Sequence, residues 1–434
     1  MKPLDIVISE WETLGANNCP DLAGRFLDAT PSVQQAVKRI EDNGLLSLTE
    51  LRQGLRIESN SHVGRIQLGD LHVTILPKVS GPALLKLVRY AYGLRRLHLI
   101  AESEHLLGPC GFEDLLITQL NAEVRELITR GLPKEYVPTK ERLSRPRGRI
   151  DFSRVARDGG VITAALPCLH HPRLEDTILN RVLLAGLHLA GQMASVLELR
   201  REARHIASVI DERVTTISFE GDILEKAGRQ INRLTAAYGP AISIIQMLAA
   251  AHGVEWQGTA SLAPLPGFLF DMNRFFQALV SRFLRDNLPG YFVKEEYRLR
   301  GMMRFNPRFN PMQRKAPTPR PDYVVMRHGQ VCSVLDAKYR DLWEKPLPRE
   351  MLYQLVVYAV SQNTQRRSSI LYPTANTSAK EARIDVSDPV SGTPVGQVSL
   401  RPVHLPTITE LVTGSGTSTK KAREAYARQL AFGV

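Results

Sequence analysis

The stretch that decides the fold of the C-terminal region is Arg320-Pro-Asp-Tyr-Val-Val-Met-Arg-His-Gly-Gln-Val-Cys-Ser-Val-Leu-Asp-Ala-Lys-Tyr339. Two runs rich in β-branched residues flank Arg327-His328-Gly329, and this pattern predicts a β-hairpin. Three-residue hairpin loops commonly end in a glycine with a left-handed backbone, so we expect Met326 to pair with Gln330.

Three charged side chains gather at the open end of this hairpin if its loop has an odd number of residues. Side chains alternate along a strand, so the expected register places Asp322, Asp336 and Lys338 on one face. A two-residue loop would place Asp322 on the opposite face. Asp336 and Lys338 interrupt an apolar run, where buried charge is costly unless it is paired or bound to a metal. An Asp–Lys ion pair at a strand end is the purely structural alternative.

A pair of carboxylates beside a lysine suits metal-dependent hydrolysis of phosphodiesters. Carboxylates hold Mg²⁺, a bound ion activates water, and a neighbouring lysine stabilises developing charge. Pro321-Asp322 followed by Asp336-Ala337-Lys338 resembles the PD-(D/E)xK nuclease signature. The resemblance implies that Asp322 and Asp336 are catalytic metal ligands, that Lys338 is catalytic, and that Mg²⁺ is the cofactor, with Mn²⁺ as a substitute. A D…DxK pattern alone arises by chance in many chains.

A helix predicted over residues 348–362 carries two further candidates. Gln354 and Tyr358 are four residues apart, so they share one face of this helix. A Q-x-x-x-Y motif downstream of the DxK strand resembles that of the RecB-like branch of these nucleases, which implies a catalytic role for both. The alternative is that they form the polar flank of an amphipathic helix.

The segment before the hairpin is strongly basic. It has seven cations, no carboxylate, and several interleaved prolines and phenylalanines, which suits contact with a DNA backbone. The alternative is a solvated loop. The candidate DNA-binding residues are Arg298, Arg300, Arg304, Arg308, Arg314, Lys315 and Arg320.

Composition limits the class of protein. The 434 residues have a formal net charge of +12, which favours polyanionic partners such as nucleic acid or an anionic membrane surface. The four cysteines form no C-x-x-C pair, so a zinc ribbon or a disulfide framework is not expected. No stretch is long and apolar enough to span a membrane, and we expect a cytoplasmic protein.

The pattern of elements predicts an α+β or α/β multidomain chain. We expect a mixed α/β domain over 1–110, a mainly helical region over 111–260, a nuclease-like module over 261–405 and a surface appendage over 406–434. Runs flanking Gly69-Asp70 predict a second hairpin, apolar residues at helical spacing predict a helix over 272–287, and a strand is expected over 291–299. A helical pattern starts at Asp176 and continues past Arg200, and the basic run 140–149 is expected to be a solvated loop, with a phosphate-contacting loop as the alternative.

The chain also resembles the McrC family, the nuclease subunits of McrBC modification-dependent restriction systems, over most of residues 60–405. One departure from the family is Gln277, where many relatives have a glutamate directed towards the metal site; a glutamine carries no charge and cannot act as a base. The motifs that carry the resemblance are residues 63–78, 131–136, 147–150 and 168–181, together with the PD-(D/E)xK set.

This resemblance implies a restriction-endonuclease-like C-terminal core that cleaves double-stranded, modified DNA, such as DNA with 5-methylcytosine. It also implies an McrB-type AAA+ GTPase hexamer as partner, whose channel receives the N-terminal part, so that residues 1–110 contact the motor and stimulate GTP hydrolysis. The chain has no G-x-x-x-x-G-K-[ST] loop and is not expected to be the motor itself. Two alternatives are a non-catalytic DNA-binding adaptor, which Gln277 favours, and a standalone repair-type nuclease.

Overall fold

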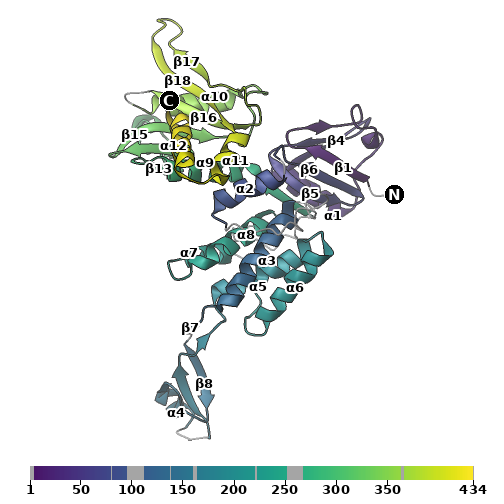
Figure 1. The fold of residues 1–434 in the computed structure, drawn as a ribbon, viewed down its shortest axis with the longest axis vertical. Helices are drawn as coiled ribbons and strands as arrows, with labels where there is room; N and C mark the ends of the chain where they lie inside the picture. Colours follow the sequence, from purple (N-terminus) through teal and green to yellow (C-terminus); the bar gives the residue numbers. More distant parts are fainter. Residues whose placement is uncertain are drawn as a thin grey trace. The chain divides into compact units, whose positions relative to one another are not determined.

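The computed structural model describes residues 4–79, 81–94, 112–136, 138–159, 164–219, 222–251, 267–362 and 366–433. The chain forms two compact units, one made of Met1–Arg96 together with Leu269–Val434 and the other of Leu97–Phe268 (Figure 1). The mixed α+β class is confirmed, because each unit contains both helices and sheets. The predicted boundaries at 110/111 and 260/261 lie outside the described residues.

The N-terminal part of the first unit contains two small sheets. In the first sheet, β1 (Leu4–Ser9) is parallel to β6 (Leu71–Leu76), which pairs antiparallel with β5 (His62–Leu68), and β12 (Gly267–Asp271) lies beside β5. The predicted hairpin around Gly69-Asp70 is confirmed by the β5–β6 pairing. The second sheet has the order β2 (Thr13–Leu14), β4 (Gly54–Ser59) and β3 (Leu46–Leu51). The helices of this part are η1 (Pro20–Leu22), α1 (Pro31–Asp42) and α2 (Gly81–Tyr92).

The second unit is mainly helical, as predicted. The helical pattern that starts near Asp176 is not one long helix, because it breaks between α5 (Ile178–Met193) and α6 (Leu197–Asp211). At the break the amide of Ser195 donates to the Asp114 carboxylate at 2.9 Å, which replaces a bond within a continuous helix. The helices are α3 (Phe112–Arg130), α5 (Ile178–Met193), α6 (Leu197–Asp211), α7 (Ile223–Arg229), η4 (Ala236–Tyr238) and α8 (Gly239–Ala251).

A β-rich tip, defined as residues 134–174, extends from one end of these helices (Figure 1). Its three-stranded sheet has the order β8 (Thr139–Leu143), β10 (Leu166–His170) and β9 (Arg149–Ile150), and β7 (Glu135–Tyr136) pairs with β11 (Arg173–Leu174). The short helix α4 (Phe152–Arg157) follows β9. The basic run 140–149 is therefore strand–loop–strand, and the expected loop was wrong over most of β8.

The C-terminal part of the first unit is a six-stranded sheet in the order β13 (Phe292–Glu295), β14 (Tyr323–Arg327), β15 (Gln330–Ala337), β16 (Arg367–Thr374), β18 (Pro394–His404) and β17 (Ala382–Ser387). β15, β16 and β18 are parallel, and the other pairs are antiparallel. The sequence patterns did not reveal β17, and β13 is shorter than the strand expected over 291–299.

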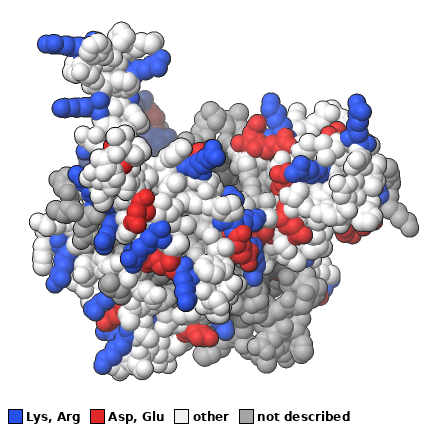
Figure 2. All heavy atoms as spheres, turned by 90° about the horizontal axis from the view of Figure 1, so that it is seen from above, with Lys and Arg blue, Asp and Glu red and all other residues white. Residues whose placement is uncertain are grey.

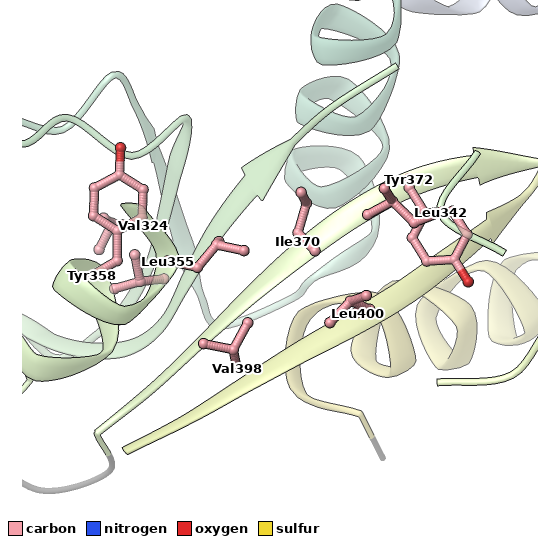
Figure 3. Packing of buried hydrophobic residues seen from close by; sticks show 9 residues of the cluster. Val324, Leu342, Leu355, Tyr358, Ile370, Tyr372, Val398 and Leu400 are labelled. Atoms are coloured by element: carbon pink, nitrogen blue, oxygen red, sulfur yellow. The ribbon is translucent and has the colours of Figure 1, made fainter. Parts of the chain in front are cut away.

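Helices cover this sheet. α9 (Met272–Asn287) matches its predicted range, and α10 (Arg349–Val360) lies within its predicted range; η5 (Pro307–Phe309) is a single turn in the basic segment. Leu355 and Tyr358 of α10 pack into a buried cluster with residues of β14, β15, β16 and β18 (Figure 3). This cluster fixes α10 against the strands that carry the charged residues.

The last two helices, α11 (Leu405–Thr413) and α12 (Thr417–Phe432), are part of this unit rather than a surface appendage. The ring of Tyr426 on α12 meets Phe283 of α9 edge-on, with a centroid distance of 5.9 Å. Its hydroxyl accepts a hydrogen bond of 2.9 Å from the His404 amide at the end of β18. A buried apolar stripe on α12 explains this docking, which its charged sequence hid.

Within the described residues, no helix combines the length and the hydropathy that crossing a bilayer would require. Figure 2 shows Lys and Arg side chains scattered over one face of the molecule, with Asp and Glu side chains between them. The excess of cations is therefore not confined to one patch of that face.

Candidate active site

Asp322 and Asp336 come together because the β14–β15 hairpin contains a bulge. The predicted three-residue loop was wrong: Arg327 pairs with Gln330, and His328 and Gly329 form a two-residue turn with φ values of 51° and 78°. The register then shifts by one residue at Cys332.

The shift restores the predicted face. Beyond it, Val324 pairs with Val334 and Tyr323 with Leu335, so Asp322 and Asp336 follow in register at the open end. Both continue the face of the buried Val324 and Val334, which is packed against α10. The expected clustering of the carboxylates is thus present, but a bulge produces it instead of the loop.

Three elements fix the position of Asp322. Its Oδ2 atom accepts a hydrogen bond of 2.8 Å from the Ala337 amide of β15 and one of 3.2 Å from Gln277 Nε2 of α9. The neighbouring Tyr323 donates its hydroxyl to the carbonyl of Gln277 at 2.7 Å. The start of β14 is therefore tied to both the next strand and α9.

Asp336 is the most buried acid of the site, with 2% of its surface exposed. Its Oδ2 atom lies 3.3 Å from Nζ of Lys338, whereas its Oδ1 atom is buried without a hydrogen-bond partner among the described residues. Burial raises the pKa of Asp336 to about 7, and the charge of Asp322 adds to the rise while Lys338 opposes it. Burial likewise raises the pKa of Asp322.

Tyr358 and Gln354 lie at the same end of the sheet. Gln354 Nε2 donates to the Tyr358 hydroxyl at 2.6 Å, so the two motif residues form one unit on α10. Burial raises the pKa of Tyr358, and the charges of Asp336 and Asp322 contribute to the rise. The structure therefore places Tyr358 within electrostatic reach of both carboxylates.

The donor set fits one hard divalent cation. A buried carboxylate oxygen with no partner is the kind of group that a cation satisfies, and a carboxylate oxygen is a preferred ligand of Mg²⁺. Among the described ranges, no three or more His, Cys, Asp or Glu side chains are grouped to hold a metal ion. The set is thus limited to the two aspartates, and Gln277 contributes an amide where a third carboxylate would add charge.

The basic segment forms an exposed loop between β13 and β14. All seven candidate DNA-binding cations are exposed, and Arg320 pairs with Glu296 at 3.3 Å. For the other six, no carboxylate of the described residues lies within ion-pair distance. Phe309 beside them is 79% exposed. The loop has internal order, because the Asn310 side chain bonds both the amide and the carbonyl of Arg314 at 2.9 Å.

Sequence reasoning missed two acids near the site. Glu296 donates its amide to the Asp322 carbonyl at 2.9 Å, and its charge raises the pKa of Asp322. Its φ of 46° is unusual for a residue other than glycine. Glu10, 329 residues away from Tyr339 in the sequence, accepts a hydrogen bond from the Tyr339 hydroxyl. No sequence pattern around either residue predicts a contact between residues so far apart in the chain.

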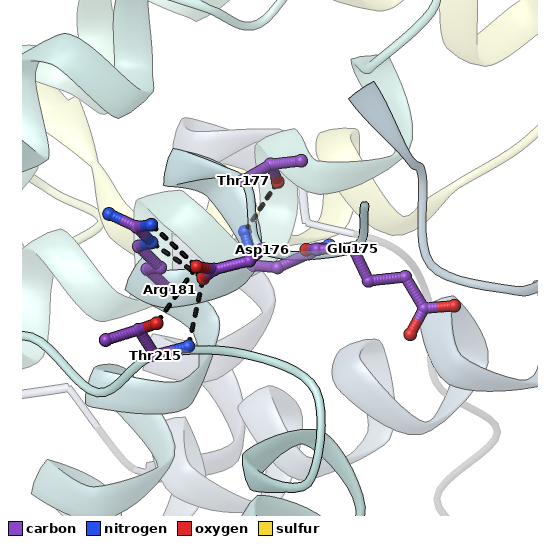
Figure 4. Close-up of polar contacts among 6 residues, drawn as sticks. Glu175, Asp176, Thr177, Arg181 and Thr215 are labelled. Carbon is purple, nitrogen blue, oxygen red and sulfur yellow. Dashed lines mark hydrogen bonds and ion pairs between the residues drawn. The ribbon is translucent and has the colours of Figure 1, made fainter. Parts of the chain in front are cut away.

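Two of the motifs that resemble the McrC family, residues 168–181 and 147–150, lie in the second unit. Asp176 receives two hydrogen bonds of 2.7 Å from Arg181 and two of 2.9 Å from Thr215, and these bonds lower the pKa of Asp176 to about 2 (Figure 4). Glu175 lies beside it and pairs with Lys134 at 3.1 Å, across the base of the tip. Residues 168–181 therefore attach the tip to the helices of the second unit.

The position of Gly148, in the motif 147–150, has no room for a side chain. Its φ is 69°, and a Cβ atom there would lie 2.5 Å from the Leu169 carbonyl oxygen of β10. The motif therefore keeps β9 close to β10 within the tip.

A family model described as McrBC 5-methylcytosine restriction system component matches residues 57–373. The chain belongs to this McrBC family. The resemblance seen in the sequence is confirmed. In this McrBC component, Asp322, Asp336 and Lys338 lie at the ends of the neighbouring strands β14 and β15, and the Gln354–Tyr358 pair lies on the covering helix α10.

A solved structure shares this fold. A refined half-complex from a tetradecameric assembly of Thermococcus gammatolerans McrB AAA+ hexamers with bound McrC is similar over 98% of this chain and 100% of that chain, with a TM-score of 0.60 and 18% identity. A cryo-EM structure of the Thermococcus gammatolerans McrBC complex covers 65% of this chain and 88% of that chain, with a TM-score of 0.45 and 18% identity. No curated protein matches the sequence.

Proposed function

We propose that this McrBC component is the Mg²⁺-dependent endonuclease subunit of its restriction system and cleaves double-stranded, modified DNA. The observation that carries the proposal is the buried, unpartnered Oδ1 atom of Asp336, next to Asp322 and Lys338. The order α9–β13–β14–β15–α10–β16 around these residues supports a PD-(D/E)xK nuclease core.

Each residue has a defined task in this proposal. Asp322 and Asp336 would hold the ion, which supplies activation of water and stabilisation of charge on the phosphate when it is bound. Lys338 holds a positive charge 3.3 Å from Asp336, where it orients the attacking water and neutralises charge on the scissile phosphate. Gln354 keeps the Tyr358 hydroxyl in place beside the carboxylates.

The exposed loop between β13 and β14 supplies DNA contact. Its cations precede Asp322 in the chain, and six of the seven have no ion-pair partner among the described residues, so phosphates bound by the loop would lie close to the carboxylates. Contacts of this type are independent of base sequence, which agrees with a subunit that leaves recognition of the modified base to a partner.

We further infer an McrB-type AAA+ GTPase hexamer as partner, because the similar solved structure contains McrC bound to such hexamers. Within the first 150 residues, two elements are candidates for the motor contact. The β5–β6 hairpin is covered at its end, since Leu4 donates to the Asp70 carbonyl at 2.7 Å and Arg25 pairs with the Asp70 side chain at 3.4 Å. The tip is exposed instead, so we propose it as a candidate for the motor contact in addition to residues 1–110.

The test is cleavage of methylated double-stranded DNA by the full chain with its cognate motor, GTP and Mg²⁺. We expect the wild type to cut and Asp336→Asn to lose at least about a hundredfold in rate, because one ligand of the ion is lost. Asp336→Asn is expected to keep the stimulation of GTP hydrolysis. Asp385→Asn, an exposed aspartate on β17, is the matched control and should cut normally.

Each other outcome points to a different function. Equal cutting by wild type and Asp336→Asn would contradict the site. A wild type that stimulates GTP hydrolysis but never cuts would establish the non-catalytic adaptor, which the uncharged Gln277 beside Asp322 favours. Cutting without the motor would establish a standalone nuclease.

A further inference from the structure

The residue that follows Lys338 is held by the N-terminal part of the same unit. Tyr339 is 3% exposed, and its hydroxyl donates to Glu10 Oε1 at 2.9 Å. Its ring meets Phe276 of α9 edge-on, with a centroid distance of 5.9 Å. On the other side, the Lys338 amide donates to the Leu371 carbonyl of β16 at 3.0 Å. The backbone that carries the Lys338 side chain is thus held on both sides.

Glu10 is itself fixed. It follows β1 directly, is 2% exposed, and its Oε1 atom also accepts a hydrogen bond of 2.6 Å from the Lys78 amide after β6. One carboxylate oxygen therefore joins the N-terminal sheet to Tyr339.

Neighbouring contacts strengthen the same junction. Lys345 Nζ donates to the Trp11 carbonyl at 2.9 Å, and the Arg340 guanidinium lies 5.8 Å from the centre of the Trp11 ring. Lys78 pairs with Glu344 at 3.6 Å. The segment after Lys338 is thus attached to the N-terminal sheet at several points.

A second set of contacts joins the N-terminal part to helix α9. The amide of Met272 donates to the Ser61 carbonyl at 3.0 Å, and the side chain of Asn273 donates to Ser61 Oγ at 2.5 Å. These residues begin α9, the helix whose Gln277 bonds Asp322. The N-terminal part therefore touches both elements that hold the charged residues.

We propose that Glu10 and Tyr339 are positioning residues for DNA cleavage, and that their hydrogen bond makes the N-terminal sheet a working part of the nuclease by holding Lys338 in register with Asp336. This inference rests on the proposed nuclease function. A displaced catalytic group reduces rate steeply with small shifts in position. Loss of the Tyr339 hydroxyl should therefore lower the rate of the chemical step, while the ring of residue 339 still packs on Phe276.

The first experiment measures single-turnover cleavage by the full chain with its motor. We expect Tyr339→Phe to lower the rate constant about tenfold with unchanged affinity for DNA. Glu10→Ala should behave alike, and Glu10→Gln should recover most of the rate because an amide oxygen still accepts the bond. In a Lys338→Gln background, Tyr339→Phe should have no further effect, since it acts through Lys338.

Tyr426→Phe is the matched control, because Tyr426 is also a buried tyrosine whose hydroxyl makes one hydrogen bond in this unit. Tyr426→Phe should lower the melting temperature by an amount similar to that caused by Tyr339→Phe, and it should keep the wild-type cleavage rate. An equal loss of cleavage in Tyr426→Phe would overturn the proposal, as would wild-type cleavage by Tyr339→Phe or an undiminished effect in the Lys338→Gln background.

A second measurement is independent of catalysis. Hydrogen–deuterium exchange of the isolated full chain should be about tenfold faster over residues 335–341 in Tyr339→Phe, and unchanged there in Tyr426→Phe. Unchanged exchange in Tyr339→Phe would overturn the positioning role. If the wild type does not cut DNA but exchange responds as expected, the nuclease function fails while the junction stands.

Discussion

At the scale of single residues, Asp336 combines deep burial with an unpartnered oxygen. Its pKa is raised to about 7 by burial first and by Asp322 second. An aspartate with a higher pKa in the folded chain than in the unfolded chain favours folding when protonated, so stability falls as pH rises from about 4 to the folded value. Without a bound cation, the ionised carboxylate is therefore a source of instability above neutral pH.

Asp336→Asn should accordingly stabilise the protein in EDTA at pH 8, because a neutral amide replaces a buried charge. The melting temperature is expected to rise by about 2–4 °C for each kcal/mol relieved, with a much smaller rise at pH 5. Differential scanning calorimetry at both values, with Asp385→Asn as the exposed control, measures this. A loss of stability at pH 8 would show that the ionised form is well accommodated without metal.

The proximity of Asp322, Asp336 and Lys338 could be predicted from the sequence, but the register that produces it could not. Spacing and residue type indicated Asp322, Asp336 and Lys338 as one group. The turn at His328-Gly329 has two residues, and only the bulge at Cys332 returns Asp322 to the same face. A bulge depends on tertiary packing, here of Val324 and Val334 in the core, and has no local signature in this stretch.

At the scale of elements, the loop between β13 and β14 combines exposure with internal order. Asn310 bridges to Arg314, and Asn306 accepts the amide of Arg308 at 3.0 Å, so cations are presented from a defined backbone. Secondary structure with strong periodicity, such as α9, was predicted to the residue. The break between α5 and α6 was not predicted, because it depends on Asp114, which lies 81 residues before Ser195 in the sequence.

Replacing Arg304, Arg308 and Arg314 together by glutamine should weaken DNA binding for all sequences alike. Each lost phosphate contact is expected to reduce the slope of log K against log salt by about 0.9 on double-stranded DNA. Titrations at several salt concentrations check this, with Lys38, Lys420 and Lys421 changed to glutamine as a charge-matched control on exposed helix positions. A salt slope like that of the control would identify the segment as a solvated loop.

At the scale of the whole molecule, the chain divides by contact and not by order along the sequence. Residues 1–96 belong with residues 269–434, and residues 97–268 form the intervening unit. Hydropathy patterns identify elements but cannot show that β1 and β15 share a unit, because the contacts that join the two parts, such as Glu10 to Tyr339 and Tyr90 to Phe283, are between residues far apart in sequence. The tip, by contrast, is exposed. Its Arg142 pairs with Asp158, whereas Arg145, Arg147 and Arg149 have no ion-pair partner among the described residues.

Changing Arg145, Arg147 and Arg149 in the tip to glutamine should reduce stimulation of the motor's GTP hydrolysis at least severalfold. These side chains are exposed and outside the candidate active site, so folding and metal binding are expected to persist. GTP turnover is measured at increasing concentrations of the variant, with Lys38, Lys420 and Lys421 changed to glutamine as control. Stimulation equal to wild type would return the motor contact to another part of the chain.

The discontinuous first unit has a consequence for how the protein is made. Residues 1–96 emerge from the ribosome first. The strands that complete their unit emerge only after residues 97–268 have been synthesised, a delay on the order of tens of seconds. The intervening unit can fold during this interval. Glu10 meets Tyr339 only when the later segment has emerged, so a truncated or stalled chain lacks the complete candidate active site. Under the proposed nuclease function, delayed assembly would protect the cell's own DNA from incomplete copies of the protein.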